Sequence, residues 1–254
     1  MGYPSDLTDN EWELIEHFFN PSDKRGCSYI HDKKQIVDAI LYLVKGGITW
    51  RMLPNDFPPW QTVYYHFDKW NKQGVWEKVL DKLNKLNRRK SGKKESPSYG
   101  IIDAASVKTQ YDSEDRGIDG GKRVKGHKRH AIVDVLGNLL HVNVHAANLS
   151  DTKSACPILD RCKEKYPSIQ AFSGDAGYRG TAVKFVSETL GIALHISMRI
   201  KDGWAVLPKR WVVERIFAWL NNFRRLAKDF EKLTGTSENV IRIAMMKITV
   251  AKCI

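Results

Sequence analysis

Apolar residues in the first 90 positions recur at the spacing of helices. A capping-box pattern at Thr8 and Glu11 predicts a helix over Trp12 to Phe19. Asp32 is placed to cap a second helix that ends at Gly46-Gly47. The apolar positions of this second helix share one face: Ile36, Ala39, Ile40, Leu43 and Val44.

Two further helices are predicted over Trp60 to Asn71 and over Val75 to Leu86. The first of them follows the loop LPNDFPPW and is rich in polar and aromatic residues, as in the second helix of a helix-turn-helix unit. Its side chains that would face a DNA groove are Gln61, Tyr64 and His66. An ordinary three-helix bundle with an aromatic core explains the same pattern equally well.

From Tyr99 the pattern changes to that of strands. Strands are predicted over Tyr99 to Ala105, Lys128 to Val135, Leu139 to Ala146, Ser168 to Phe172 and Ala193 to Met198. Helices are expected at Thr152 to Lys165, before Leu190, and as two long helices separated by Thr234-Gly235-Thr236. Three strands, a helix, a strand, a helix, a strand and further helices form the order of an RNase H-like α/β domain.

A polar, basic segment, NRRKSGKKESPS at residues 87–98, separates the two patterns. It predicts a helical domain at 1–90, a basic linker at 91–98 and a second domain of strands and helices at 99–254. The chain of 254 residues has a net charge of +12, with 41 basic and 29 acidic side chains. Residues 99–254 carry most of the excess, which favours a polyanionic partner for this half.

The cysteines show no pattern of a metal site or a disulfide framework. Cys27, Cys156, Cys162 and Cys253 form no CxxC pair, and no apolar run approaches the roughly 20 residues that span a bilayer. We therefore expect a protein of the reducing cytoplasm, without a signal peptide.

Three acidic residues stand in unusual settings. Asp103 follows the apolar pair Ile101-Ile102, Asp175 lies in the turn GDAGYRG after an apolar run, and Glu214 lies among Arg and Trp in RWVVERIFAWL. A single strand-end Asp is usually a loop cap, and a helical Glu beside Arg215 is usually half of a surface ion pair. If the fold brings the three together, their charges need a compensating cation, and carboxylates are the ligands that Mg²⁺ prefers.

Several segments together resemble the DDE transposases of bacterial insertion sequences, in particular the insertion sequence five group. The matching text is DAASVKT (103–109), GGKRVKGHKRHAIVD (120–134), GDAGYRG (174–180) and RWVVERIFAWLNNFRRLAKDFEKL (210–233). The amino-terminal segments YPSDLTDNEWELIEHFF and GGITWRMLPNDFPPWQTVYYHFDKW resemble the same group, so the likeness covers nearly the whole chain.

The resemblance implies an RNase H-like catalytic domain with Asp103, Asp175 and Glu214 as catalytic metal ligands. It also favours DNA recognition by the helix at 60–71. A wider group of related transposases has Tyr, Arg, Glu and Lys at fixed helical offsets. Here only Arg210 and Glu214 fit, with Leu207 and Asn221 at the outer positions, so the contacts of that Tyr and Lys do not carry over.

Basic residues around the three acids are expected to contact DNA phosphates. The run GGKRVKGHKRH contributes Lys122, Arg123, Lys125, Lys128 and Arg129. A helix continuing past Leu220 would place Arg210 near Glu214, and Asn221, Arg225 and Lys228 in line with it. A solvated charged face is the alternative reading of both segments.

These observations predict a transposase that binds the terminal inverted repeats of its element. It would cleave and transfer DNA strands with two Mg²⁺ ions, for which Mn²⁺ can substitute, and act as a homodimer or larger oligomer on double-stranded DNA in the bacterial nucleoid. Two rivals remain: a sequence-unspecific metal nuclease, and a DNA-binding protein whose catalysis has been lost.

Overall fold

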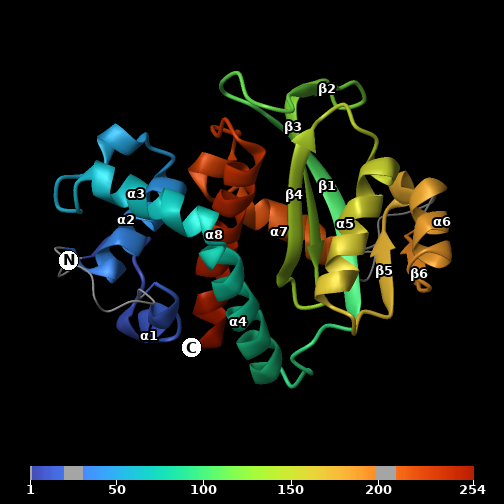
Figure 1. Ribbon diagram of the computed structural model, residues 1–254, viewed down its shortest axis with the longest axis horizontal. Coiled ribbons are helices and arrows are strands. Elements are labelled where there is room, and N and C mark those ends of the chain that lie inside the picture. Colours follow the sequence, from blue (N-terminus) through green and yellow to red (C-terminus); the bar gives the residue numbers. More distant parts are fainter. Residues whose placement is uncertain (1, 20–30, 198–209) are drawn as a thin grey trace.

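The computed structural model describes residues 2–19, 31–197 and 210–254 (Figure 1). The first part of the chain is all-helical, as predicted. Its helices are α1 (Asp9–Glu13), α2 (Lys33–Gly46), α3 (Trp60–Lys72) and α4 (Val75–Lys90), with short 3₁₀ turns η1 (Glu16–Phe18) and η2 (Trp50–Met52).

The predicted helix caps are present. The Glu11 amide donates to Oγ1 of Thr8 at 3.2 Å, and the Thr8 amide donates to Oε2 of Glu11 at 2.8 Å. The helix that follows is nevertheless shorter than the predicted Trp12 to Phe19, because it ends at Glu13 and gives way to η1. Asp32 caps α2, and Gly47 ends it with a φ of 69°, a conformation that favours glycine.

A loop, not a tight turn, joins α2 to α3. Residues 47–59 include η2 and three prolines, whereas the turn of a helix-turn-helix unit has roughly three or four residues. The prolines and Gly47 explain the length, since neither residue type continues a helix. The helical class is confirmed, but the two helices are not joined as in a compact helix-turn-helix.

The second part of the chain forms one mixed sheet flanked by helices. Its strands are β1 (Tyr99–Lys108), β2 (Gly117–Asp119), β3 (Val124–Val133), β4 (Leu139–Ala146), β5 (Ala171–Gly174) and β6 (Ala193–Ile196). In the sheet, β3 pairs antiparallel with β1 on one side and with β4 and β2 on the other, and β5 and β6 run parallel to β1. This strand order is that of the RNase H-like fold and confirms the predicted class.

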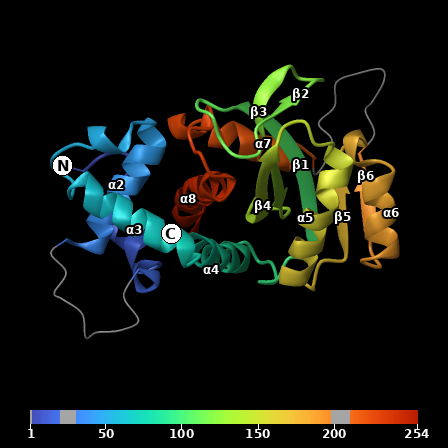
Figure 2. The same ribbon diagram turned by 45° about the horizontal axis from the view of Figure 1, so that its top comes forward.

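Helices cover both faces of the sheet. They are α5 (Asp151–Lys165), α6 (Thr181–Glu188), α7 (Arg210–Leu220) and α8 (Thr234–Cys253). Ile102 packs in one core with α5 and α6, whereas its neighbour Ile101 packs in the other core with α4, α7 and α8. Successive strand residues point to opposite faces, so β1 alternates between the two cores. Figures 1 and 2 show α5 on one side of the sheet and α7 on the other.

The predicted long helix after residue 210 is wrong beyond Leu220. α7 ends there, Phe223 is extended, and a 3₁₀ turn, η4 (Arg224–Leu226), follows before α8 begins at Thr234. The Asn221-Asn222 pair favours this ending because asparagine side chains compete with the backbone for hydrogen bonds. Asn221, Arg225 and Lys228 therefore do not continue the face of α7 that carries Glu214.

The segment predicted as a linker is tied to both parts of the chain. Arg88 donates to the carbonyl of Lys94 at 2.7 Å and forms a buried ion pair with Asp134 at 2.5 Å. The Asn84 amide donates to the Leu139 carbonyl at 2.8 Å. One hydrophobic core runs from α2 and α3 through α4 and α8 to α7 and β1. The boundary between residues 90 and 99 stays a prediction, but the core is continuous across it.

Two further expectations for the whole chain concern membrane-spanning helices and the cysteines. No helix among the described residues is long and apolar enough to cross a membrane. Cys156, Cys162 and Cys253 are free thiols, and Cys27 lies outside the described residues.

Candidate active site

Asp103 lies within β1, and Asp175 comes directly after β5, the parallel neighbour of β1. Ile101 on β1 pairs with Ser173 on β5, and each acid comes two residues after this pair along its own segment. The backbone fixes one oxygen of each carboxylate. Asp103 Oδ1 accepts from the Ala104 amide at 2.8 Å, and Asp175 Oδ1 accepts from the Gly177 amide at 2.8 Å. Adjacent strands are about 4.8 Å apart, so these two carboxylates share one small region.

The pKa of Tyr178 reflects the negative charge of this region. Its ring is buried, and its hydroxyl has no hydrogen-bond partner among the described residues. Burial raises the pKa of this hydroxyl well above its usual value, and the charges of Asp103, Asp151 and Asp175 raise it further. Three carboxylates are therefore close enough to act on one phenol.

Asp151 is the member of this group that the sequence analysis missed. A methyl group placed on Gly177 would lie 3.0 Å from Oδ1 of Asp175 and 3.6 Å from Oδ2 of Asp151. Asp151 begins α5 soon after β4, and β4 runs parallel to β1, so its carboxyl end lies at the same edge of the sheet. The signal was present as an acid following a strand of that edge, in the text NLSDT.

Lys128 compensates part of this negative charge from inside the protein. It is 5% exposed, and its Nζ lies 2.6 Å from Oδ1 of Asp151, 2.8 Å from the Leu149 carbonyl and 3.9 Å from Oδ2 of Asp119. A lysine with these partners has no free face for a phosphate. The expected phosphate contact of Lys128 is therefore corrected to an internal counter-ion of Asp151.

Glu214 approaches from the face of the sheet that Asp103 shares with Ile101. α7 is anchored on this face by Val213, Ile216 and Leu220, which are buried in the core with Ile101. Glu214 itself is exposed on the helix. Among the described residues, however, no group of three or more His, Cys, Asp or Glu side chains gathers tightly enough to hold a metal ion. Asp103 and Asp175 thus both come two residues after a paired position of β1 and β5, and Glu214 lies on α7, which packs against β1.

Arg129 and Arg225 are also interior residues. Arg129 is 5% exposed and donates to the Leu226 carbonyl at 2.8 Å. Arg225 is 8% exposed, pairs with Glu231 at 2.7 Å and donates to the Ile48 carbonyl at 3.0 Å. Their burial removes them from the set of expected phosphate contacts, although Nε and one terminal nitrogen of Arg129 have no hydrogen-bond partner among the described residues.

The remaining basic residues of the expected set are exposed where the structure describes them. Lys122, Arg123 and Lys125 lie on the hairpin of β2 and β3, and Lys122 Nζ is 3.4 Å from the carbonyl of Ala104, next to Asp103. Lys228 is exposed and donates to Gln110 at 3.1 Å. The side chain of Arg210, like Leu207, lies outside the described part.

The candidate recognition helix α3 presents only part of its expected face. Gln61 and Tyr64 are exposed, whereas His66 is partly buried beside Lys33 at 3.2 Å. Burial, reinforced by Lys33, lowers the pKa of His66 to about 4. A neutral His66 adds no charge to a DNA-binding surface near neutral pH.

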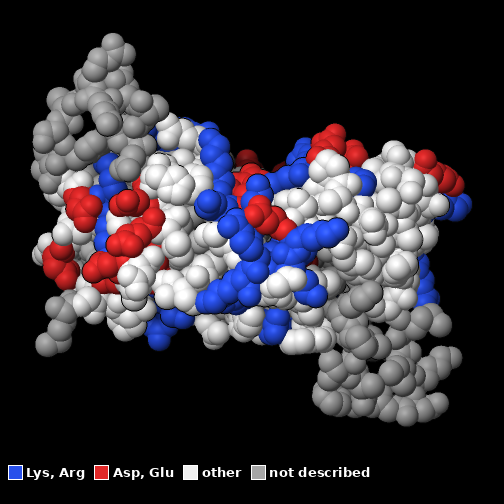
Figure 3. Space-filling view, turned by 90° about the horizontal axis from the view of Figure 1, so that it is seen from below, with Lys and Arg blue, Asp and Glu red and all other residues white. Residues whose placement is uncertain are grey.

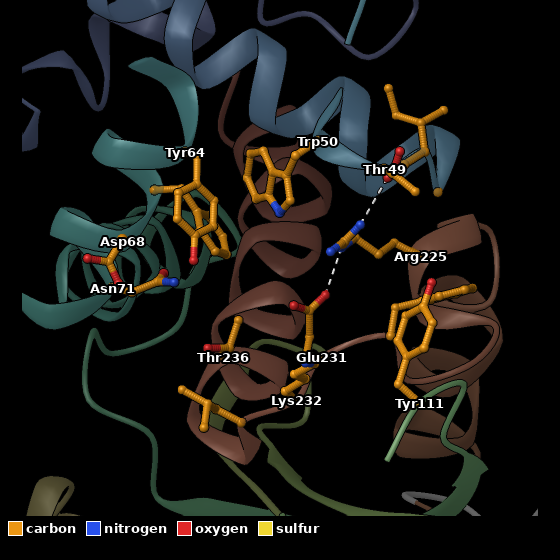
Figure 4. Close-up of a pocket in the computed structure, with 15 residues that line it drawn as sticks. Thr49, Trp50, Tyr64, Asp68, Asn71, Tyr111, Arg225, Glu231, Lys232 and Thr236 are labelled. Atoms are coloured by element: carbon orange, nitrogen blue, oxygen red, sulfur yellow. Dashed lines mark hydrogen bonds and ion pairs between the residues drawn. The ribbon is translucent and has the colours of Figure 1, made fainter. Parts of the chain in front are cut away.

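A cavity of about 600 Å³ lies between α3 and the catalytic half (Figure 4). Tyr64 and Trp50 form one wall, and Tyr111 lies on the opposite side. The Arg225–Glu231 pair lies between these walls and bonds to the end of α2 through Ile48. Arg225 thus joins the two halves of the chain at this cavity.

Comparison with protein families gives two matches along the chain. The model described as "Putative transposase of IS4/5 family" matches residues 7–80, and the model described as "Transposase DDE domain" matches residues 94–247. These two segments cover the helical part and the sheet domain in turn. The narrower assignment to the insertion sequence five group stays a prediction.

Two curated relatives match parts of the chain. The "Putative transposase for insertion sequence element IS402" of Burkholderia cepacia is 32% identical over 119 residues, which are 42% of this chain and 54% of that protein. The uncharacterized protein y4sN of Sinorhizobium fredii is 27% identical over 74 residues, 29% of this chain and 59% of that protein. The chain thus spans somewhat more than half the length of these relatives.

Solved structures give only distant similarity. A pre-cleavage Mos1 transpososome has a TM-score of 0.31 at 11% identity, with 92% of this chain and 81% of that chain covered. The Mos1 strand transfer complex has a TM-score of 0.27 at 12% identity, with 91% and 80% covered. TM-scores this low do not support a relationship, so the family of this chain is assigned from the family models alone. Because the model of the transposase DDE domain spans more than half of the chain and includes Asp103, Asp175 and Glu214, this chain belongs to the DDE transposase family.

Proposed function

We propose that this chain binds the terminal inverted repeats of its own mobile element and catalyses DNA strand cleavage and strand transfer. The observation that supports the proposal is that Asp103 and Asp175 each come two residues after the paired Ile101 and Ser173 of the parallel neighbours β1 and β5, with the Glu214 helix packed on β1. Membership of the DDE transposase family supports it. The match covers only 54% of the IS402 relative, so the activity of the whole protein is a proposal.

Asp and Glu carboxylates are suitable ligands for divalent metal ions, and we propose Mg²⁺, with Mn²⁺ as a substitute. Asp103, Asp175 and Glu214 would hold them, because Mg²⁺ prefers carboxylate oxygens. When bound, two such ions supply a clamp on the attacking and leaving oxygens of an in-line displacement at phosphorus. The crowding of carboxylates around Tyr178 fits a site that is completed by a cation.

The chain's own residues would position these groups. Asp103 would be held firmly as a ligand, since its residue pairs with Ala131 of β3 and follows the part of β1 that also pairs with β5. Asp175 is held by the turn η3 (Ala176–Tyr178), because its Oδ1 accepts a hydrogen bond from the Gly177 amide. Lys128 holds Asp151 in a charge-compensated pair beside them, which keeps a fourth negative charge from acting fully on the site.

The proposed partners are double-stranded DNA ends, target DNA and a second copy of this chain. Two ends must be joined, so we propose a homodimer or larger oligomer on DNA. Gln61 and Tyr64 on α3 are the exposed residues proposed to read the ends, and Lys122, Arg123, Lys125, Arg210 and Lys228 are proposed to contact phosphates. Since its substrate would be the chromosome, we propose that it acts in the bacterial nucleoid.

Separate Asp103→Asn, Asp175→Asn and Glu214→Gln variants test the proposed chemistry. Each keeps the side-chain shape and removes a charged ligand, so we expect binding of the element's ends to persist while cleavage and strand transfer with Mg²⁺ fall to background. The readout is product formation on labelled duplexes that carry the inverted repeats found next to the gene. If one variant keeps near wild-type cleavage, its residue is not a ligand.

Matched controls separate this loss from a general effect of substitution. Glu188→Gln on α6 and Asp112→Asn, whose side chain is 98% exposed, make the same chemical changes away from the site and should cleave normally. Unrelated duplexes test the rival function. Equal cleavage of cognate and unrelated duplexes would identify an unspecific nuclease, and binding without cleavage by the wild type would identify a protein without catalysis.

A further inference from the structure

α7 carries a row of alternating aromatic and basic residues one position away from Glu214. Trp211, Arg215 and Trp219 follow each other at intervals of four residues and therefore share one face of the helix. The Arg215 guanidinium lies 4.3 Å from the ring centre of Trp211 and 4.6 Å from that of Trp219. Lys252 of α8 stacks on the same Trp219 ring at 4.5 Å.

The cations of this row are not neutralised by acids of the described part. Arg215 has no ion pair with a described carboxylate, and its Nε is buried without a hydrogen-bond partner. Burial and the neighbouring charge of Arg215 lower the pKa of Lys252. The charge of Asp134 raises the pKa of Lys252, but Asp134 is already paired with Arg88 and accepts a hydrogen bond from Asn138. The positive charges of Arg215 and Lys252 thus lie close together although they repel each other.

The row continues into the basic end of α4. Lys90 lies next to the chain end at Ile254, close enough to Cys253 to affect its pKa, and Cys253 follows Lys252. Lys93 and Lys94 are exposed just beyond. On the face seen in Figure 3, a band of Lys and Arg crosses the middle of the molecule, on the side where α4 and α8 end. We name Trp211, Arg215, Trp219, Lys252, Lys90 and Lys93 the cationic strip.

We propose that the cationic strip binds the phosphate backbone of duplex DNA that extends from the candidate active site. This proposal rests on the proposed function, and it assigns a further DNA surface that includes none of the expected contacts. A guanidinium stacked between two indole rings uses its faces for the rings and keeps its in-plane N–H groups for anions. The rings also hold the side chain still, so less entropy is lost when a phosphate binds.

The size and position of the strip fit a DNA backbone. Trp211 to Trp219 spans about 12 Å along the helix at about 1.5 Å per residue, a length of roughly three to four base pairs. Trp211 is 41% exposed and lies within one turn of Glu214. A duplex whose scissile phosphate is near Glu214 would therefore reach Arg215 first, then Lys252 and the end of α4.

An Arg215→Met, Lys252→Met double variant tests the strip. Methionine keeps an apolar contact with the rings and removes both charges. We measure affinity for cognate and unrelated duplexes between about 50 and 200 mM salt, without divalent metal so that no cleavage occurs. The slope of log affinity against log salt should flatten by roughly 0.9 per lost contact, and affinity at about 0.1 M salt should fall about eightfold per contact, equally for both duplexes.

A second variant and a control keep each outcome decisive. Lys90→Gln with Lys93→Gln changes exposed side chains only and should also flatten the slope, even if the first variant folds poorly. Lys184→Met on α6, which is exposed on the other face of the sheet, should leave it unchanged. An unaltered slope in the Lys90, Lys93 variant, or in a folded Arg215, Lys252 variant, overturns the strip. A wild type that binds no duplex at all would instead overturn the proposed function.

Discussion

His66, His130, His141 and His145 share one property, which is that burial lowers the pKa of each imidazole. His130 and His145 bond to each other at 2.8 Å, so the pair is held in the neutral form in the interior of the sheet. Burial, reinforced by the charges of Arg242 and Lys165 and opposed by that of Glu77, lowers the pKa of His141 to about 4. At the scale of residues, this protein thus contains several buried histidines whose protonation is disfavoured.

We predict that acid destabilises the protein in part through His141. Its pKa is lower in the folded chain than the unfolded value of about 6.5, so the unfolded chain binds more protons between these values. The stabilisation is present above pH 6.5 and is lost as the pH falls toward 4, by up to about 1.4 kcal/mol per pH unit. Urea unfolding at pH 7 and pH 5.5 should show a smaller loss for His141→Gln than for the wild type.

The exposed His17→Gln variant is the control and should keep the wild-type dependence on pH. If His141→Gln loses as much stability as the wild type over this range, His141 is not the source of the effect.

At the scale of elements, the end of α2 meets the turn that follows α7. Gly47 has a φ of 69°, and a Cβ built there would lie 2.8 Å from Cβ of Arg224 and 3.0 Å from its carbonyl carbon. Glycine at this position therefore allows both the helix end and the close approach of η4. The same approach lets Arg225 reach the carbonyl of Ile48.

We predict that Gly47→Ala destabilises the protein by about 2–4 kcal/mol, from strain at positive φ together with the clash against η4. Gly74→Ala is a matched control, because Gly74 has a φ of 64° and a methyl group added there would meet nothing within 4 Å. It should lose only about 1 kcal/mol. Urea midpoints measure both, and equal losses would show that the contact with η4 adds nothing.

At the scale of the whole molecule, the helical part and the sheet domain share a core. Leu83 of α4, Ile243 of α8 and Ile216 of α7 belong to one buried cluster, and polar groups of α4 bond to the turn between β3 and β4. Removing residues 1–90 would expose the face of α8 that packs on α4. The two parts are therefore coupled in stability, whatever their separate roles in DNA binding.

We predict that the full chain unfolds in one cooperative thermal transition, because breaking the core on one side of residue 90 exposes apolar surface on the other. Calorimetry measures it, and the van't Hoff and calorimetric enthalpies should agree. Two resolved transitions would instead support independent domains at 1–90 and 99–254.

Much of the fold followed from local patterns in the sequence. The Thr8 and Asp32 caps, the glycine end of α2 and the bounds of β4 depend on residues within a few positions of each other, and each is confirmed. The position of Asp175 directly after a short strand was also visible, because an apolar run followed by an acid is local, whereas Asp103 lies within β1, which continues to Lys108. The end of α7 at Leu220 was missed, because the apolar spacing continued after the backbone hydrogen bonds of the helix had stopped.

Whether a charged side chain is buried or exposed depends on contacts between distant segments. Lys128 and Asp151 are 23 residues apart, Arg129 and Leu226 are 97 apart, and Arg225 and Ile48 are 177 apart. A basic residue in the sequence has the same charge whether it faces solvent or a buried carboxylate, and only packing selects between them. The family and five of the six described strands could be predicted from the sequence, because they rest on local text, whereas β2 was missed. Which cations are internal, the approach of Asp151 to Asp175, and the lack of an acidic partner for Arg215 and Lys252 among the described residues emerged only from the packed chain, since local sequence does not encode long-range contacts.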